Sequence, residues 1–347
     1  MGIWAHSRIR EVALRVLEDT MLRHYRHRSV NSLLDHRLLT LLVRRLASDM
    51  DAEIIENVLP DSRRVHLGTC PEAGVLLKVF WDLAGYSCLG RQILKHVTYE
   101  HSSGSFDMEL DMTKTPECGY YFYDCNPMLT AHIMAAAGPG LMIDVGANVG
   151  FYSLVGALAF DQVHAFEPCS DTFARLKRNI HLSPKCRVQA HPIGLSSATE
   201  AAALRISPGN TGSNAVVRNS AAAREKESLE KIQLRTLDEV AADLSLSDVK
   251  FMKVDVEGHE QAVLLGARDT LSRWRPIVFL ECHTNDDVVD CARALPAGYV
   301  PWDIVEGRQT SLNELLHNPH RYLDVLFTPD DRLAGRFIGG TACANGE

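Results

Sequence analysis

The segment 141–150 constrains the fold of this chain more than any other. It reads Leu-Met-Ile-Asp-Val-Gly-Ala-Asn-Val-Gly, an apolar run that ends in Asp144 and a turn of small residues. Apolar residues continue to Phe160, but Asp144, Asn148 and the glycines make this stretch a poor membrane span. Glycine suits a sharp strand-to-helix turn that a ligand approaches closely. We therefore expect a buried strand, a ligand-binding turn and a helix, and no transmembrane segment.

Strand and helix patterns alternate from about residue 129 onward, which is typical of a sheet with helices on both faces. The predicted strands are 141–145, 162–167, 187–192, 249–255 and 276–282. The predicted helices are 150–159, 170–181, 237–243, 259–271 and 286–294. Residues 200–234 interrupt the alternation, so we expect an inserted loop or hairpin near the site. The predicted fold class is α/β, with a doubly wound, mostly parallel sheet.

A second acid follows the turn at the spacing that nucleoside sites use. Glu167 ends the second predicted strand about 20 residues past the turn, where a carboxylate can accept hydrogen bonds from both ribose hydroxyls. The fingerprint G-x-G-x-x-G is not met, because Asn148 and Phe151 stand where its later glycines would be. This favours a nucleoside ligand without a pyrophosphate. The alternative is that Asp144 and Glu167 only cap the helices that follow them.

Five short blocks follow one another along this half of the chain: Asp144-Val-Gly-Ala-Asn-Val-Gly150, Ala165-Phe-Glu-Pro168, Gly209-Asn-Thr-Gly212, Lys253-Val-Asp-Val-Glu-Gly-His-Glu260 and Glu281-Cys-His283. Together they resemble the FkbM-type methyltransferase family, over about residues 100–330. The resemblance implies a class I, Rossmann-like enzyme that uses S-adenosylmethionine (AdoMet) to O-methylate a hydroxyl of a small molecule, sugar or secondary metabolite. Asp144 would engage the amino end of the methionine moiety, directly or through water. The expected cofactor-binding residues are Asp144, Gly146, Asn148, Gly150, Glu167 and Asp255.

Two strand ends carry side chains suited to such a transfer, since a hydroxyl at neutral pH needs a general base or a metal ion. Asp255 ends the fourth predicted strand and is followed by Glu257 and His259, and His283 follows the fifth. An unperturbed imidazole titrates near neutral pH, so His283 is the predicted base. Asp255 would orient the acceptor, the base or the AdoMet amino group. Glu257 and His259 complete the candidate catalytic residues.

Glu281 and His283 stand two residues apart, so we expect them on the same side of an extended chain. Several of the acids near the two strand ends allow a second interpretation. Glu257 and Glu260 could instead decorate the start of a helix, where the dipole favours carboxylates, and for Glu260 this is the favoured role. Asp255, Glu257 and His283 could also hold Mg²⁺. Nothing in their spacing requires a metal ion, and no metal site is assigned.

Charge and cysteine usage narrow the partners and the compartment. The formal net charge is -8, whereas binding along a phosphate backbone needs clustered Lys and Arg. We therefore expect a small-molecule or glycan hydroxyl acceptor and no nucleic acid. The nine cysteines form no C-x-x-C pair, and Arg8, Arg10 and Glu11 precede any apolar run, unlike in a secretory signal. These features predict a reducing, cytoplasmic location.

The first hundred residues match no motif and are expected to form a mainly helical extension. Leucines at 34, 38, 41, 42 and 46 make one apolar face, within fifty residues that hold nine arginines and five acids. This face could pack on the main domain or on a second subunit of a homo-oligomer, or it could meet a membrane or an anionic substrate. The rest of the expected organisation is a helix over 75–97, a β-hairpin over 101–130 with strands around 106–112 and 120–123, the AdoMet domain over 131–330 and a flexible tail over 331–347.

Two other classes of protein share parts of this pattern. A nucleotide-dependent oxidoreductase of similar fold would share the sheet and the acid, but the short-chain type also needs Tyr-x-x-x-Lys, which does not occur here. A non-catalytic AdoMet-fold module would bind a partner without chemistry. The polar strand ends at Asp255 and His283 argue against such a module.

Overall fold

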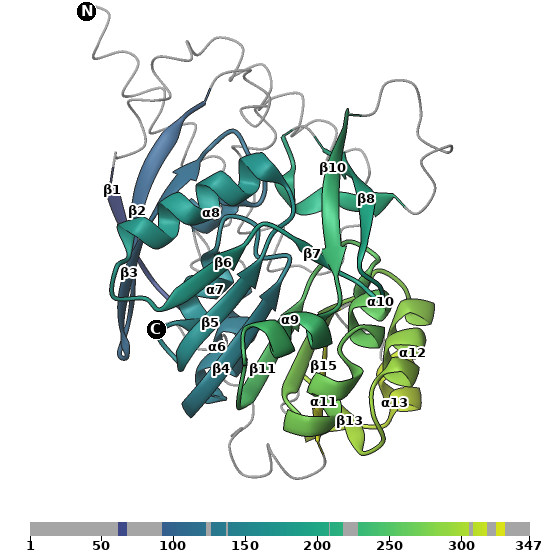
Figure 1. Cartoon of the computed structure of the whole chain (residues 1–347). Helices are drawn as coiled ribbons and strands as arrows, with labels where there is room; N and C mark the ends of the chain where they lie inside the picture. Colours follow the sequence, from purple (N-terminus) through teal and green to yellow (C-terminus); the bar gives the residue numbers. More distant parts are fainter. Residues whose placement is uncertain are drawn as a thin grey trace, which may run out of the picture.

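A mixed sheet of eight strands forms the centre of the described chain (Figure 1). The computed structural model describes residues 62–67, 92–122, 126–136, 138–207, 209–217, 228–304, 308–317 and 324–329. The strands are β4 (Gly138–Val145), β5 (Phe160–Phe166), β6 (Val188–His191), β11 (Val249–Val254), β12 (Ile277–Glu281), β13 (Tyr299–Asp303), β14 (Arg308–Gln309) and β15 (Asp324–Pro329). Their order across the sheet is β14-β13-β15-β12-β11-β4-β5-β6.

The strand directions confirm the predicted sheet in part. The five predicted strands, β12, β11, β4, β5 and β6, are neighbours and pair in parallel. The sheet as a whole is mixed, because β15 runs antiparallel to both of its neighbours, β12 and β13. β14 is also antiparallel to β13. The three C-terminal strands were not predicted, and they replace the simple doubly wound arrangement at this edge.

Helices cover both faces of the sheet. Successive residues of each strand point to opposite faces, so the apolar side chains form one core on each face, and helices pack on both. On one face, side chains of β4, β11 and β12 pack with α6 (Pro127–Ala135) and α7 (Phe151–Gly156). On the other face, the alternate side chains pack with α9 (Leu237–Asp243), α10 (Glu260–Leu265), α11 (Arg268–Trp274), α12 (Asn285–Ala294) and α13 (Leu312–His317). None of the described helices is both long enough and apolar enough to cross a membrane.

The predicted helix over 259–271 is two helices, α10 and α11, separated at Gly266. A Cβ at this glycine would lie 1.9 Å from the carbonyl oxygen of Ser196, so the break lies where two backbones touch. The other predicted helices agree closely with α7, α9, α12 and α8 (Ser170–Leu182). The stretch from Leu141 to Phe160 is a strand, a turn and a helix, as expected.

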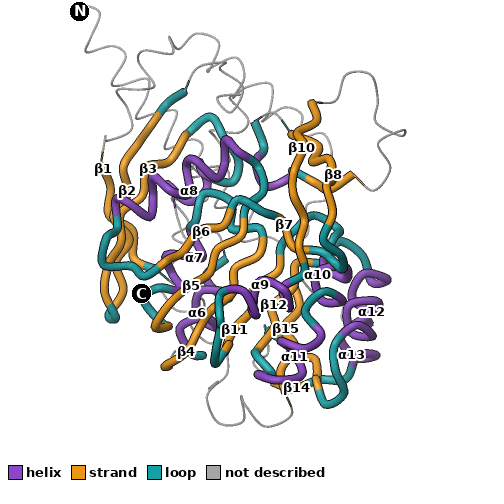
Figure 2. The backbone as a smooth tube through the Cα atoms, in the orientation of Figure 1, coloured by secondary structure: helices purple, strands orange, loops and turns teal. Residues whose placement is uncertain are grey.

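Two smaller sheets flank the central one (Figure 2). The inserted region forms β8 (Glu200–Ile206), β9 (Ala215–Val217) and β10 (Ser228–Arg235), which pair antiparallel around β8 and confirm the predicted hairpin. β10 also pairs in parallel with the short β7 (Gly194–Leu195). The second small sheet contains β1 (Ser62–His66), β2 (Leu94–His101) and β3 (Gly104–Asp111).

The structure corrects the expectations for the N-terminal part. β1 and β2 are strands where a helical extension was expected, and residues 94–97 of the predicted helix belong to β2. The hairpin is formed by β2 and β3, while the predicted returning strand is the helix α5 (Glu117–Phe122). The buried rings of Tyr120 and Tyr121 explain the aromatic run, which a helix packs as well as a strand would. The leucine face of residues 34–46 and the tail beyond 329 lie outside the described residues.

A buried ion triad attaches this N-terminal part to the main domain. Arg175 of α8 contacts Glu117 of α5, and its Nη1 lies 3.3 Å from Oδ2 of Asp111. Both carboxyl groups are fully enclosed, and burial raises the pKa of Glu117 to about 8 against the opposing effect of Arg175. In the same helix, Asn179 accepts from the Glu109 amide (2.9 Å) and donates to the Val149 carbonyl (2.9 Å). Helix α8 therefore joins β3 to the glycine turn.

We expect Arg175→Met to lower the free energy of unfolding by about 3–5 kcal/mol, because it leaves two enclosed carboxyl groups without their cation. Arg178→Met is the matched control in the same helix: Arg178 is 61% exposed and pairs with Glu109 at the surface, so its loss should cost less than about 1 kcal/mol. Urea denaturation of both variants measures the difference. Equal losses in the two variants would contradict the role given to the triad.

Candidate functional site

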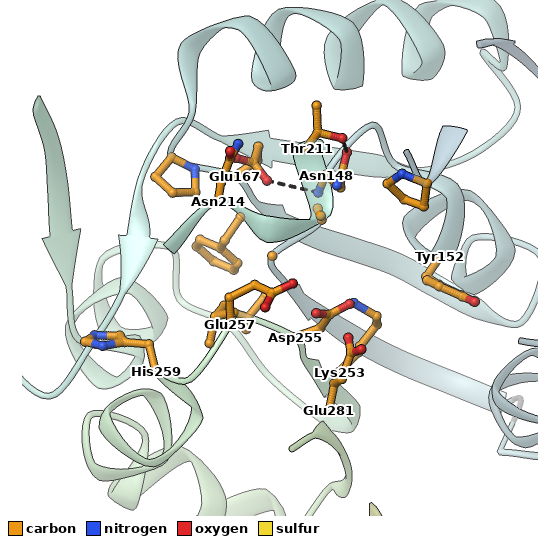
Figure 3. A pocket seen from close by; sticks show the side chains of 18 of the residues that line it. Asn148, Tyr152, Glu167, Thr211, Asn214, Lys253, Asp255, Glu257, His259 and Glu281 are labelled. Atoms are coloured by element: carbon orange, nitrogen blue, oxygen red, sulfur yellow. Dashed lines mark hydrogen bonds and ion pairs between the residues drawn. The ribbon is translucent and has the colours of Figure 1, made fainter. Parts of the chain in front are cut away.

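A cavity of about 420 Å³ opens at the carboxyl ends of β4, β5, β11 and β12 (Figure 3). The glycine turn and Glu167 form one end, and the ends of β11, β12 and β15 form the other. Its N-terminal wall consists of Pro116, Tyr120, Asn126 and Leu129, from α5, α6 and their flanks. The inserted hairpin contributes the segment Asn210–Asn214 together with Leu204, Val216 and Leu234. The volume lies in the range of small-molecule sites.

The glycine turn is fixed by backbone contacts on both sides. Gly146 has φ +76°, and a Cβ there would lie 1.8 Å from the carbonyl oxygen of Asp255. The amides of Gly146 and Ala147 both donate to the Phe166 carbonyl at 3.0 Å. Gly146 and Asn148 line the cavity, whereas Gly150 does not. A Cβ at Gly150 would lie 2.6 Å from Leu176, so this glycine is needed for packing against α8.

Glu167 lies at the end of β5 and faces the cavity. Its two carboxylate oxygens accept from the amides of Asn148 (3.0 Å) and Cys169 (2.9 Å). Burial raises the pKa of Glu167 to about 7, although both hydrogen bonds oppose this shift. Each carboxylate oxygen keeps a further lone pair, so the group can hold the turn and still accept from a ligand. The two readings offered for Glu167, capping and binding, are therefore compatible.

Asp144 lies beneath the cavity and does not line it. Ser153 donates to its Oδ2 at 2.5 Å, and its Oδ1 has no hydrogen-bond partner but lies 3.7 Å from the Lys253 ammonium. Burial raises the pKa of Asp144, opposed by Lys253. Any effect of Asp144 on a ligand would therefore pass through Lys253 or the turn.

Lys253 and Asp255 form a buried ion pair at the opposite end of the cavity. The Nζ–Oδ2 distance is 2.9 Å, and the ammonium also lies 5.4 Å from the centre of the Tyr152 ring. Burial lowers the pKa of Lys253, but Asp255 and Asp144 outweigh burial and raise it. Burial likewise raises the pKa of Asp255, but Lys253 and a hydrogen bond with Glu281 outweigh this and lower it. Both groups are therefore charged at neutral pH.

Glu281 and Asp324 complete this acidic end. The hydrogen bond with Asp255 and the charge of that carboxylate, together with burial, raise the pKa of Glu281 to about 10, so Glu281 carries a proton at neutral pH. Asp324 stands opposite Glu281 in the antiparallel pairing of β15 with β12. Its carboxylate accepts a hydrogen bond from the Asn126 side chain at 2.7 Å. Burial raises the pKa of Asp324 to about 6, opposed by that hydrogen bond.

Glu257 and His283 form a pair at the rim. Nε2 of His283 lies 3.1 Å from Oε2 of Glu257, and the two side chains are 45% and 24% exposed. Glu257 lines the cavity, and His283 contacts Glu257 without lining the cavity itself. β12 ends at Glu281, so His283 lies in the loop that follows, and the shared side of the two residues stays a prediction. Burial raises the pKa of Glu257, opposed by His283.

The remaining candidates near this loop have structural partners. His259 lines the cavity and is within 2.9 Å of the Ser196 hydroxyl through its Nε2. Glu260 accepts from the amides of Val256 (3.2 Å) and Gly258 (3.1 Å), which confirms its role at the start of α10. Within the described residues, no group of three or more His, Cys, Asp or Glu side chains is arranged to hold a metal ion.

Several residues of the cavity were not predicted as site residues. Lys253 and Glu281 stood in recognised blocks, and a lysine flanked directly by Met252 and Val254 in a predicted strand was a usable signal for the former. Asn126, Tyr152 and Asp324 come from elements far apart in the sequence, and no local pattern marks them.

The central sheet has a glycine turn after β4 and an acid after β5, at the strand ends where open α/β sheets bind ligands. The predicted family resemblance is confirmed within it: residues 144–297 match the family described as the methyltransferase FkbM domain.

Curated relatives show partial similarity to the chain. "Methyltransferase 1" of Beauveria bassiana is 30% identical over 145 residues, which is 37% of this chain and 58% of that protein. "Hexuronic acid methyltransferase AglP" of Haloferax volcanii is 29% identical over 163 residues, 47% of this chain and 64% of that protein. The chain thus spans less than two thirds of the length of either relative. A crystal structure of methyltransferase FkbM from Methylobacillus flagellatus matches with a TM-score of 0.36 and 18% identity, over 60% of this chain and 52% of that one.

We expect Gly146→Ala to destabilise the fold by about 3–5 kcal/mol, because the new methyl group combines a left-handed backbone with a clash against the backbone of Asp255. Gly138→Ala, at the start of β4, is the control: no atom lies within 4 Å of its added Cβ, and stability should stay within about 0.5 kcal/mol. Thermal melting of both variants tests this. A Gly146→Ala variant as stable as the control would show that the turn can move away from Asp255.

Proposed function

We propose that this chain is an AdoMet-dependent methyltransferase that O-methylates a hydroxyl of a small molecule, sugar or secondary metabolite. The observation that carries this proposal is the composition of the cavity. At one end, Glu167 could accept hydrogen bonds from the ribose of a nucleoside. At the other end, the carboxyl groups of Asp255 and Glu257 could bind or transfer a proton. The match of residues 144–297 to the FkbM domain supports the reaction class. The relative named for hexuronic acid supports a sugar-like acceptor.

The residues present fit the proposed cofactor. Gly146 has no side chain to block the approach of a ligand to the turn, and Glu167 keeps acceptor capacity for ribose hydroxyls. The acidic end suits a ligand with positive charge. When bound, AdoMet would supply a methyl group on a cationic sulfur, which becomes a neutral thioether once the methyl group has left.

The chain's own residues would then hold the acceptor in line and remove its proton. Glu257 reaches into the cavity, and its raised pKa makes it a better proton acceptor than an exposed carboxylate. His283, on the solvent side of Glu257 at 3.1 Å, is placed to pass that proton to water. We therefore assign the proton transfer to the Glu257–His283 pair, in place of His283 alone. Asp255, fixed by Lys253, would orient the acceptor or the cofactor's amino group.

The cofactor assignment predicts that Glu167→Ala weakens AdoMet binding by about 2–4 kcal/mol, because two ribose hydroxyls lose their acceptor. Glu230→Ala is the matched control: this carboxylate accepts from the Ser170 amide at 2.9 Å, outside the cavity lining, and its loss should change AdoMet affinity less than about twofold. Isothermal titration calorimetry measures both. Unchanged AdoMet affinity in Glu167→Ala would remove Glu167 from the site.

The proton-transfer assignment predicts that Glu257→Gln cuts turnover by roughly 10²–10⁴-fold and leaves AdoMet affinity nearly intact. His283→Ala should lower turnover in the same direction, whereas His317→Ala, an exposed histidine in α13, should not. Transfer of labelled methyl from AdoMet to a panel of glycosides and hydroxylated metabolites gives the readout, with melting temperatures as a folding check. Binding of AdoMet without transfer to any acceptor would favour the non-catalytic module.

A cytoplasmic location and rejection of nucleic acids stay predictions.

A further inference from the structure

A hydrogen bond between Asn126 and Asp324 joins two segments of the cavity wall that lie 198 residues apart in the sequence. Nδ2 of Asn126 donates to Oδ2 of Asp324 at 2.7 Å. Asn126 caps α6, where its Oδ1 accepts from the Leu129 amide at 2.9 Å, and Asp324 begins β15. Both side chains line the cavity. Both also lie outside residues 144–297, so the family match gives them no role.

Asp324 belongs to the acidic end of the cavity. It stands opposite Glu281 in the pairing of β15 with β12, and the charges of Asp255 and Lys253 both act on its pKa. Glu167 lies at the other end, beside the glycine turn (Figure 3). In the proposed enzyme the nucleoside occupies that other end, and the proton acceptor Glu257 is near Asp255. A hydroxyl that reacts at Glu257 therefore brings the rest of the acceptor towards Asp324.

The carboxylate of Asp324 keeps most of its capacity to accept hydrogen bonds. A carboxylate offers about four acceptor sites. Within the part of the chain that the structure describes, one of them is used, by Asn126. The nearby ammonium of Lys253 is paired with Asp255 at 2.9 Å. Asp324 is thus a charged acceptor whose orientation is fixed by a neutral amide, and it faces a ligand cavity.

The wall next to Asn126 and Asp324 is apolar. Leu129 follows in the first turn of α6, and Tyr120 of α5 lines the same wall with its ring stacked on Phe151 at 4.4 Å. A fixed carboxylate beside an aliphatic and an aromatic side chain matches a ligand that carries hydroxyls along one edge and C–H groups on its face. Ring polyols such as pyranosides and cyclitols have this character.

We propose that Asp324, held by Asn126, is a specificity-determining residue that accepts a hydrogen bond from a second hydroxyl of the acceptor. The enzyme then methylates polyols in preference to monohydric alcohols. The proposal rests on the proposed function and deepens it, because it names the acceptor class. With one hydroxyl at Glu257 and another at Asp324, the acceptor has a fixed orientation, which decides the hydroxyl that is methylated. Asn126 is a positioning residue in this arrangement.

The test measures methyl transfer from labelled AdoMet by the full chain at pH 7.5, where Asp324 is ionised. The acceptors are methyl glucopyranoside, methyl galactopyranoside and myo-inositol, each beside its monodeoxy analogues, with cyclohexanol and benzyl alcohol as monohydric compounds. The variants are Asp324→Ala, Asp324→Asn and Asn126→Ser, of which the last keeps a capping oxygen for α6. Asp290→Ala is the matched control, because it removes an exposed carboxylate of α12 outside the cavity lining.

In the wild type, removal of one hydroxyl other than the methylated one should lower kcat/KM by about 10–100-fold, as expected for a hydrogen bond to a charged group. In Asp324→Ala the same removal should change kcat/KM less than about threefold, because the partner of that hydroxyl is already absent. The KM of the intact polyol should rise about tenfold or more, while AdoMet affinity changes less than about twofold. Asp324→Asn and Asn126→Ser should show smaller changes in the same direction, and Asp290→Ala none.

Several results would overturn the proposal. One is an unchanged effect of the missing hydroxyl in Asp324→Ala, and another is equal transfer to monohydric alcohols in the wild type. A loss of AdoMet affinity in Asp324→Ala would assign the residue to the cofactor, and equal losses on every acceptor with a lower melting temperature would make its role structural. If Asp324→Ala does not fold, Asp324→Asn carries the same comparison. Transfer from bound AdoMet to none of the polyols would also overturn the proposal, whereas failure of the wild type to bind AdoMet would contradict the proposed function.

Discussion

The arrangement of the cavity depends on the ion pairs that the buried ammonium group of Lys253 forms with two carboxylates. The ammonium group stands between Asp144, which lies beneath the glycine turn, and Asp255, which ends the neighbouring strand. Removing a charge from water is costly, and a fully enclosed lysine persists only where carboxylates compensate it. This one cation keeps Asp255 ionised and so leaves the proton of the neighbouring pair on Glu281. The charge state of the acidic end therefore follows from the position of Lys253 in β11.

Much of the floor of the cavity could be predicted because its signals are local. The apolar run before Asp144, the glycines of the turn and the spacing to Glu167 all lie within one strand–helix–strand unit, where sequence and geometry are tightly linked. The position of His283 was harder to predict, because the two-residue period holds only while the chain remains a strand, and β12 ends at Glu281. His283 lies two residues beyond that end and meets the site through its contact with Glu257.

The other walls could not be predicted, because they depend on pairings between distant parts of the chain. Asp324 reaches the site because β15 inserts antiparallel beside β12, which the segment 324–329 does not specify by itself. Residues 117–122 suit a strand by composition, yet they form a helix whose first acid is anchored by Arg175, 58 residues away. In both cases tertiary contacts decide between local conformations of similar intrinsic preference.

Most of the cavity is built from two parts of the chain with different attachments, while Asp324 of β15 adds to its acidic end. The floor belongs to residues 144–297, whose backbone is fixed within the central sheet, whereas Pro116, Tyr120, Asn126 and Leu129 precede that region. The N-terminal wall meets the inserted hairpin through the hydrogen bonds of Thr115 with Gly209 and Thr211, each 2.9 Å. Substitutions in this wall can therefore reshape what the cavity admits while the turn and Glu167 keep their geometry. In the proposed enzyme, such a division would let acceptor preference diverge under selection while the end at Glu167 stays unchanged.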